Sequence, residues 1–338
     1  MVSISLYQKS DQGNFQEYIR RAFHEKYILG DPKYLEWQYG GGLYIAKDGD
    51  EIVGHFGFRD LKCKIGERSD VLRVLMNLFV LEQYRILGVG ARLAQEVFRD
   101  KYFVMVAGYS PLSQRLFPHF RPDWKDAGNL SKYLKIFRGD SPLFDGFKVP
   151  EIATIQPVSD GYELNEISSF DAKFEALWKR IRPRYQVTVE RSPEYLNWRF
   201  ADHPIFHYRT ISASRSGTLA GYLVWRLEDG ADFKVARIID WICEPEAEKA
   251  LLGKFVESAA AAGATLADFL FSGSLYRATL KELGFFDVAR TEFEKFPIHF
   301  NPVSAKKPYI NVAFDLPASL QDCYFTKADG DQDRPNPF

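Results

Sequence analysis

Residues 85–90 have the types and spacing of an anion-binding loop, and they read Arg-Ile-Leu-Gly-Val-Gly. The apolar run 71–81 before them predicts a strand, and the amphipathic run over roughly 88–99 predicts a helix. The first N–H groups of a helix have no acceptor within the helix, and the helix dipole adds positive charge there. Gly88 and Gly90 lack Cβ atoms, so phosphate oxygens could approach the backbone closely. The loop therefore predicts a pyrophosphate site.

Two common phosphate motifs do not fit this loop. A Rossmann turn needs a third glycine where this chain has Leu93, and a P-loop needs Gly-Lys-Ser/Thr. The remaining alternative is a glycine-rich helix start that binds no ligand. Arg85 and Arg92 favour a ligand, because both could donate charge-assisted hydrogen bonds to it.

The bulk properties of the chain exclude several classes of protein. A formal net charge of -1 over 338 residues provides no basic excess for nucleic acid. The sequence holds no apolar run of membrane-spanning length, and its first ten residues show no secretion signal. The three cysteines lie far apart without metal-like spacing. We therefore expect a reduced cytoplasmic setting, no metal site, no nucleic-acid partner and no membrane span.

Two short segments repeat each other. Residues 30–39 read Gly-Asp-Pro-Lys-Tyr-Leu-Glu-Trp-Gln-Tyr, and residues 191–200 read Arg-Ser-Pro-Glu-Tyr-Leu-Asn-Trp-Arg-Phe. In each copy Asp or Ser precedes Pro, as at a helix N-cap with Pro in the first helical position. The recurrence favours a packing role for Trp37 and Trp198 over substrate stacking.

The predicted elements follow one order in both halves, α-α-β-β-β-α-β-α-β. Because the order agrees as well as the letters, duplication explains the repeat better than chance. We predict an α/β (α+β) fold with mixed sheets in two tandem domains, residues 1–148 and 149–338. Proline and glycine punctuate the chain near 144–156, where we expect the linker.

The second copy of the loop has lost its glycines. Residues 244–253 read Glu-Pro-Glu-Ala-Glu-Lys-Ala-Leu-Leu-Gly, so Ala247, Ala250 and Leu252 stand where the first copy has its arginine and two glycines. Glutamates at a helix start suit the dipole but repel a pyrophosphate. We therefore expect a degenerate second domain that supports the fold and helps to form an acceptor pocket.

The pattern Arg-x-x-Gly-x-Gly after a long strand resembles the acyl-CoA signature of the GNAT acetyltransferase superfamily. The lead-in Val80…Glu82…Tyr84-Arg85 is similar too, and the element order of both halves matches that family's fold. The resemblance implies acetyl-CoA or a related acyl-CoA as co-substrate, with pantetheine along the long strand and pyrophosphate on the loop. The binding residues that it implies on strand and loop are Leu78, Phe79, Val80, Arg85, Ile86, Leu87, Gly88, Val89, Gly90 and Ala91.

The residues for acyl transfer are harder to identify. Transfer to an amine needs a deprotonated nucleophile and a proton donor for the leaving thiolate. The family often has a carboxylate on the long strand, where this chain has Asn77. His55 is a candidate base because its intrinsic pKa lies near working pH, and a histidine satisfied within the sheet is the alternative. Arg115 occupies the position of the family's usual tyrosine acid, so Tyr109 is the nearest substitute, with aromatic packing as the alternative.

Two further features remain open at this stage. Arg180, Arg182, Arg184 and Arg191 could hold a phosphorylated substrate, although a solvated basic face is the simpler interpretation. The aspartate-rich tail 327–337 lacks the distal Glu of an EF-hand, so it is either an ordered lid or a polar terminus.

Three functions compete. The first is an acyl-CoA-dependent N-acyltransferase, an N-acetyltransferase acting on a small amine, with an amino sugar of polysaccharide assembly as the leading acceptor. The second is a non-catalytic acyl-CoA-binding or regulatory protein with the same fold. The third, a transferase that uses aminoacyl-tRNA, is disfavoured by the missing basic surplus. The sequence leaves a homodimer open.

Overall fold

The computed structural model describes residues 1–152, 160–304 and 306–334. The chain forms two compact units. Unit 1 contains residues 1–128, 311–319 and the segment that starts at Asp329. Unit 2 contains residues 129–310 and 320–328. No helix among the described residues combines the length and the apolar character that crossing a membrane requires.

Unit 1 is built on one mixed sheet in the order β1-β2-β3-β4-β5-β17-β6. Neighbouring strands from β1 to β4 run antiparallel, β4 and β5 run parallel, and β17 returns antiparallel to β5. The strand bounds are β1 Ser3–Leu6, β2 Leu43–Asp48, β3 Glu51–Ile65, β4 Arg68–Val80, β5 Phe103–Ala107, β6 Lys125–Asn129 and β17 Asn311–Phe314.

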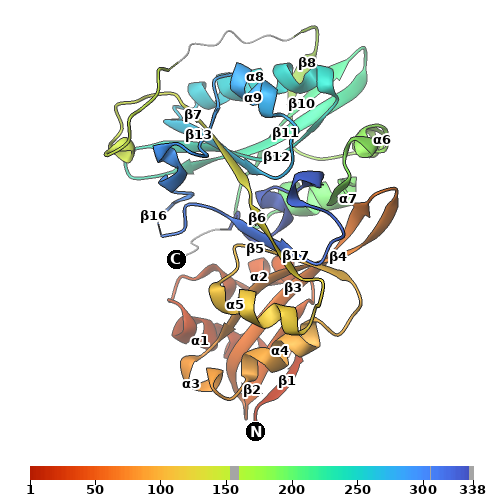
Figure 1. Cartoon of the computed structure of the whole chain (residues 1–338), viewed down its shortest axis with the longest axis vertical. Helices are drawn as coiled ribbons and strands as arrows, with labels where there is room; N and C mark the ends of the chain where they lie inside the picture. Colours follow the sequence, from red (N-terminus) through yellow and green to blue (C-terminus); the bar gives the residue numbers. More distant parts are fainter. Residues whose placement is uncertain (153–159, 305, 335–338) are drawn as a thin grey trace. The chain divides into compact units, whose positions relative to one another are not determined.

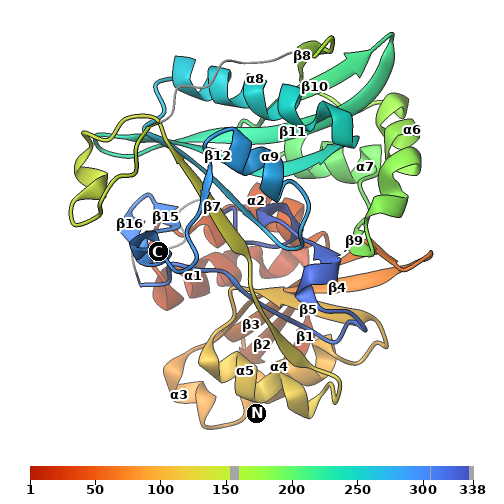
Figure 2. The ribbon, with the colours of Figure 1, turned by 45° about the horizontal axis from the view of Figure 1, so that its top comes forward.

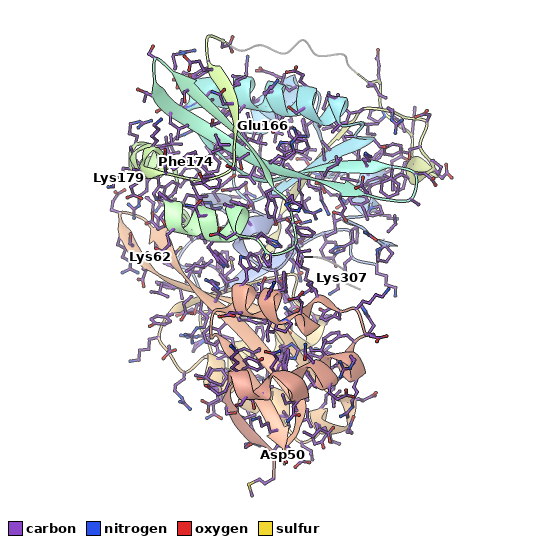
Figure 3. The ribbon with its side chains drawn as sticks, turned by 180° about the vertical axis from the view of Figure 1, so that it is seen from behind. Asp50, Lys62, Glu166, Phe174, Lys179 and Lys307 are labelled. Atoms are coloured by element: carbon purple, nitrogen blue, oxygen red, sulfur yellow. The ribbon has the colours of Figure 1, made fainter. Side chains whose placement is uncertain are left out.

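Helices cover both faces of this sheet. Successive side chains of a strand point to opposite faces. His55 on β3 packs against Phe15 and Tyr18 of α1, whereas its neighbour Phe56 stacks on Phe117. Figure 3 shows α1 (Gln12–Ala22) and α2 (Pro32–Tyr39) in front of the sheet, and Figure 1, from the other side, shows α4 (Val89–Val97) and α5 (Pro111–Leu116).

Unit 2 has its own mixed sheet in the order β14-β7-β13-β12-β11-β10-β8. Helix α8 (Glu248–Ala261) packs along β10 and β11, as Figure 2 shows. The other helices are α6 Ala172–Ile181, α7 Pro193–Leu196 and α9 Arg277–Glu282. The strand bounds are β7 Ser131–Ile136, β8 Glu163–Ile167, β10 Arg209–Arg215, β11 Thr218–Asp229, β12 Lys234–Cys243, β13 Leu266–Phe271 and β14 Phe286–Asp287.

The predicted elements occur in the predicted order in both halves, with three kinds of addition. One further strand, β1 or β8, precedes the first helix of each half, the short helix α3 precedes α4, and strand β9 (Val187–Val189) separates the first two helices of the second half. The repeated segments form α2 and α7. Each begins with Pro after a capping side chain, Asp31 or Ser192, that accepts hydrogen bonds from the first turn. In each, tyrosine and tryptophan rings three residues apart pack together, 5.4 and 5.7 Å between centroids.

The units exchange strands, so their limits differ from the predicted division after residue 148. Strand β7 follows the first half in sequence but lies in the sheet of unit 2, between β13 and β14. Strand β17, near the end of the chain, fills the place beside β5 in unit 1. Phe144, inside the predicted linker, belongs to the apolar core of unit 2, and residues 153–156 of that linker lie outside the described residues.

Candidate functional site

The loop 85–90 forms an exposed turn between α3 (Glu82–Arg85) and α4. Gly88 adopts the left-handed conformation, with φ 70° and ψ 15°, and is the N-cap of α4. Residues other than glycine rarely adopt this backbone conformation. Ile86 and Leu87 are 90% and 61% exposed, which is unusual for large apolar side chains and leaves the loop open to a ligand.

The first amides of α4 fit the predicted anion site. Helical geometry leaves the N–H groups of Val89, Gly90 and Ala91 without acceptors inside the helix. A Cβ on Gly90 would meet only the Val80 side chain, at 3.9 Å, so the space outside this turn is open. The side chain of Arg85 is partly engaged within the protein, because its Nε donates to the Val80 carbonyl at 2.9 Å.

The strand before the loop separates from its parallel neighbour. Pairing of β4 with β5 ends at Leu75 and Val106, although β4 continues to Val80. The cause is a bulge in β4, where Asn77 has a φ of 53° and the register with β3 shifts. A bulge bends its strand and ends regular pairing. It therefore opens a gap between β4 and β5.

A cavity of about 170 Å³ lies in this gap. Leu75 to Leu78 of β4 line one side, and Val106 to Ser110 at the end of β5 line the other. Phe56 and Phe117 add apolar surface from one face of the sheet. Three residues of the C-terminal segment also line it: Asp331, Gln332 and Arg334.

A chain of hydrogen bonds crosses the gap from β4 to β5. The Asn77 amide donates to the Tyr39 hydroxyl at 3.0 Å and accepts from Arg334 through its oxygen. Arg334 also binds the Asp331 carboxylate, 2.7 Å away. The Gln332 side-chain amide in turn donates a hydrogen bond to the Ala107 carbonyl at the end of β5, at 3.0 Å.

Two of the three predicted catalytic residues meet at this cavity. Asn77 lines it from β4, and Tyr109, which is 6% exposed, lines it from the turn after β5. Leu78 also lines it. Phe79 points to the opposite face, where its ring lies 4.6 Å from that of Phe23. Sequence reasoning missed Asp331, Gln332 and Arg334 as lining residues, and the only signal for them was the run of aspartates in the tail.

His55, the third candidate, lies in the core and not in the cavity. It is fully buried, and its Nδ1 is 2.8 Å from the Tyr18 hydroxyl. Burial lowers the pKa of His55 to about 3, and its Nε2 has no hydrogen-bond partner among the described residues. These observations favour a histidine that packs within the sheet over a general base.

The buried histidine predicts a pH dependence of stability. Below pH 6.5 the unfolded chain takes up a proton at His55 that the folded chain does not, so acidification favours unfolding. We expect the free energy of unfolding to fall by up to ~1.4 kcal/mol per pH unit between pH ~6 and ~4 from this one group. Denaturant titrations of wild type and His55→Gln measure the difference in slope. An unchanged slope in His55→Gln, or an equal change in the exposed control His119→Gln, would contradict this assignment.

The corresponding helix start in unit 2 is occupied by its own carboxylates. Ala247, the N-cap of α8, is fully buried. Glu248 in the first turn pairs with Arg184 at 3.2 Å and accepts from the Thr279 hydroxyl at 2.7 Å. Glu244, just before, pairs with Arg180 at 3.1 Å. Carboxylates paired with arginines thus stand where unit 1 offers amides and glycines.

In unit 2 the side chain of Tyr324 lies against the strand end that corresponds to the gap between β4 and β5, and a cavity of about 140 Å³, lined by Tyr324 and by Ser272 to Leu275 after β13, lies next to it. Strands β12 and β13 stay paired only to Ile238 and Phe269. Three residues beyond Ile238, the Trp241 N–H donates to the Tyr324 hydroxyl at 3.2 Å, and that hydroxyl donates to the Trp241 carbonyl at 2.7 Å. Counted from the last strand pair, Leu78 is the equivalent of Trp241 in unit 1. The Tyr324 hydroxyl thus occupies both main-chain groups of Trp241.

The four clustered arginines are ion-paired within unit 2, so they do not form the solvated basic face that the sequence suggested. Besides the two pairs already described, Arg182 binds Glu190 at 2.9 Å, and Arg191 binds Asp240 at 2.9 Å with both side chains fully buried. These pairs leave each guanidinium with a carboxylate of the chain itself.

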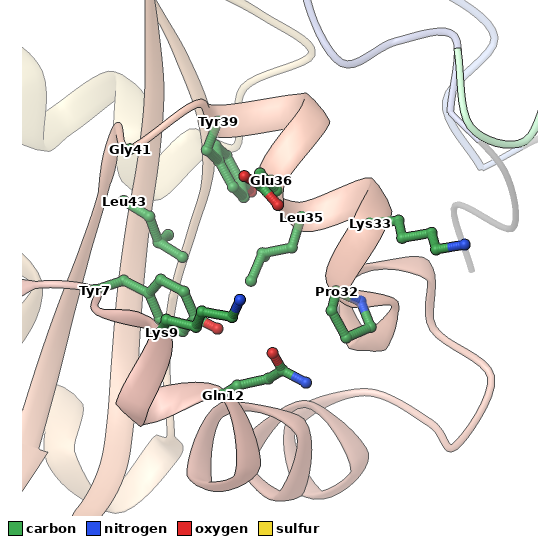
Figure 4. Close-up of a pocket in the computed structure, with 10 residues that line it drawn as sticks. All are labelled: Tyr7, Lys9, Gln12, Pro32, Lys33, Leu35, Glu36, Tyr39, Gly41 and Leu43. Carbon is green, nitrogen blue, oxygen red and sulfur yellow. The ribbon is translucent and has the colours of Figure 1, made fainter. Parts of the chain in front are cut away.

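A second, larger cavity of about 390 Å³ lies beside α1 and α2 in unit 1. Figure 4 shows Lys9 and Leu35 pointing into it, while Lys33 extends away. Tyr39 lines it as well, and its hydroxyl accepts the hydrogen bond from Asn77. Residues of β4, β5 and the α4 loop do not line it, so we do not place the predicted ligand there.

Comparison with known proteins identifies the fold. No model of a known family matches the sequence, and no curated protein matches it significantly. Solved structures are similar, among them a GCN5-related N-acetyltransferase from Anabaena variabilis, with a TM-score of 0.65 and 11% identity over 93% of this chain and 72% of that one. A protein from Enterococcus faecalis, described as a probable N-acyltransferase, gives 0.61 and 14% over 92% and 72%. A GCN5-related N-acetyltransferase from Kribbella flavida gives 0.59 and 13% over 93% and 70%. These likenesses confirm the predicted GNAT fold.

Proposed function

We propose that the chain is an acyl-CoA-dependent N-acyltransferase, an N-acetyltransferase whose single site lies in unit 1. The observation that carries this proposal is the alignment of three features on one strand and its loop. They are the gap beyond Leu75, the cavity in that gap, and the open helix start at 89–91. The likeness of the fold to N-acetyltransferases supports the same reaction class.

Different residues would bind the pyrophosphate and the pantetheine arm of the co-substrate. The amides of Val89, Gly90 and Ala91 would hold the pyrophosphate, because they combine free donors with the positive end of the helix dipole. Main-chain groups from Leu78 to Val80 would hold the pantetheine arm, which would bring the thioester to the cavity. The acyl-CoA supplies an activated acyl group when it is bound.

The cavity suits a short acyl group and the transfer step. Asn77 is held by Tyr39 and Arg334, so its amide is fixed in place. Tyr109 is the candidate proton donor for the leaving thiolate, since it lines the cavity opposite β4. A volume of about 170 Å³ favours acetyl over long acyl chains.

Unit 2 supports the fold and binds no co-substrate in this proposal. Its paired glutamates and the Trp241–Tyr324 contact occupy the positions that unit 1 leaves open. We expect the acceptor to be a small amine, with an amino sugar as the leading candidate.

Release of free CoA thiol tests the proposed reaction. The protein is incubated with acetyl-CoA and, in turn, with glucosamine, n-butylamine and lysine methyl ester. We expect thiol release that depends on one of these amines. Binding of acetyl-CoA without thiol release for any amine would instead favour a non-catalytic acyl-CoA-binding protein, which the lack of a carboxylate over residues 71–80 also suggests.

A further inference from the structure

Strand β4 has no carboxylate near the cavity, but the carboxylate of Asp331 lines it. Residues 71–80 of β4 contain no Asp or Glu. Asp331 enters the cavity wall from the other end of the chain, and only 7% of its side chain is exposed. The segment from Asp329 belongs to the same compact unit as β4 and β5.

The segment is fitted closely to the end of β5. Gly108, the first residue after β5, has a φ of 73°, and a Cβ there would lie 2.5 Å from the amide of Gln332. That amide donates to the Ala107 carbonyl at 3.0 Å and to Asp331 at 2.8 Å. The glycine thus allows Gln332 to lie against the strand end and to hold the carboxylate beside the cavity.

The Asp331 carboxylate is held in one orientation and can still accept further hydrogen bonds. One oxygen accepts from Gln332, and the other pairs with Arg334 at 2.7 Å. A carboxylate has about four acceptor positions, so each oxygen keeps about one for a further donor. Arg334 is in turn fixed by Asn77, which leaves the carboxylate little freedom to rotate. Such fixed geometry is what acid–base catalysis requires.

We propose that Asp331 receives the acceptor amine and accepts its proton during transfer, which rests on the proposed function. The amine nitrogen forms a bond to the thioester carbonyl carbon. The carbon–sulfur bond breaks, and its electron pair stays on sulfur. The proton lost by nitrogen passes to Asp331, Tyr109 donates its proton to the thiolate, and water returns the proton from Asp331 to Tyr109, so that amide and thiol are the products. The C-terminal segment thereby supplies the carboxylate that β4 lacks.

Steady-state transfer to n-butylamine and glucosamine by Asp331→Asn tests this role. We expect kcat/KM for the amine to fall by about 100-fold or more, which is typical for loss of a general base. The Kd of acetyl-CoA should stay within about threefold, because the pyrophosphate site lies elsewhere. Asp331→Glu should restore part of the rate.

Asp333→Asn is the matched control, because Asp333 is a buried carboxylate of the same segment that does not line the cavity. Unchanged transfer by Asp331→Asn, an equal loss in Asp333→Asn, or a parallel rise in the Kd of acetyl-CoA would overturn the role of Asp331. Wild type that binds acetyl-CoA but acetylates neither amine would overturn both this inference and the proposed reaction.

Discussion

Gly90→Glu should weaken acetyl-CoA binding by about 100-fold, or ~2.8 kcal/mol, in titration calorimetry. A glutamate at this position would place a carboxylate against the phosphates and cover the amides of the first turn. The protein itself should tolerate the change, because a Cβ at Gly90 meets only the Val80 side chain, at 3.9 Å. A negative charge in the first turn also suits the helix dipole. The loss should therefore concern binding and not folding.

Gly13→Glu provides a closely matched control. Gly13 is the second residue of α1, as Gly90 is of α4, and a Cβ there meets nothing within 4 Å. The substitution adds the same charge at the same helical position in the same unit. We expect a Kd within about twofold of wild type. Equal weakening in both variants would show a general charge effect, and unchanged binding by Gly90→Glu would remove the loop from the site.

Asp240→Ala should destabilise unit 2 by about 3–5 kcal/mol, the usual cost of leaving one partner of a buried ion pair uncompensated. Arg191 and Asp240 are both fully buried, and Asp240 also accepts from the Tyr222 hydroxyl at 3.1 Å. Removing the carboxylate leaves the buried guanidinium of Arg191 without its charged partner. Denaturant unfolding measures the effect as a lower midpoint of the unfolding transition.

Two variants separate this effect from a general loss of charge. Asp229→Ala removes the carboxylate of an exposed pair with Lys234, 3.8 Å apart, and should cost less than about 1 kcal/mol. The double variant Arg191→Met/Asp240→Leu replaces both buried charges and should recover much of the lost stability. A loss in Asp240→Ala as small as that in Asp229→Ala would contradict the account.

Local patterns in the sequence predicted the elements of the fold well. Pro32 and Pro193 mark helix starts because proline fits the first helical position, and the loop glycines mark the start of α4. Because similar residues recur in the same order in both halves, the prediction for each half supported the prediction for the other. These signals depend only on residues close together in the chain.

Pairing between distant segments could not be predicted in this way. Nothing within residues 131–136 indicates that β7 joins the sheet of unit 2, or that β17 takes the place beside β5, because strand partners are not encoded locally. The same limitation hid Asp331, which lies more than 250 positions from Asn77 but shares Arg334 with it. The two interpretations of His55 could not be separated from the sequence, because alternation along β3 does not say which face of the sheet carries the cavity.

Amide hydrogen exchange with and without acetyl-CoA tests the central claim most directly, which is one acyl-CoA site per chain at the start of α4. We expect protection of the amides of 89–91 and of the strand end at 78–80, because the ligand would bond to both. The corresponding first amides of α8, those of 248–250 in unit 2, should exchange at unchanged rates. Protection at 248–250, or none at 89–91, would contradict the claim of one site at the start of α4.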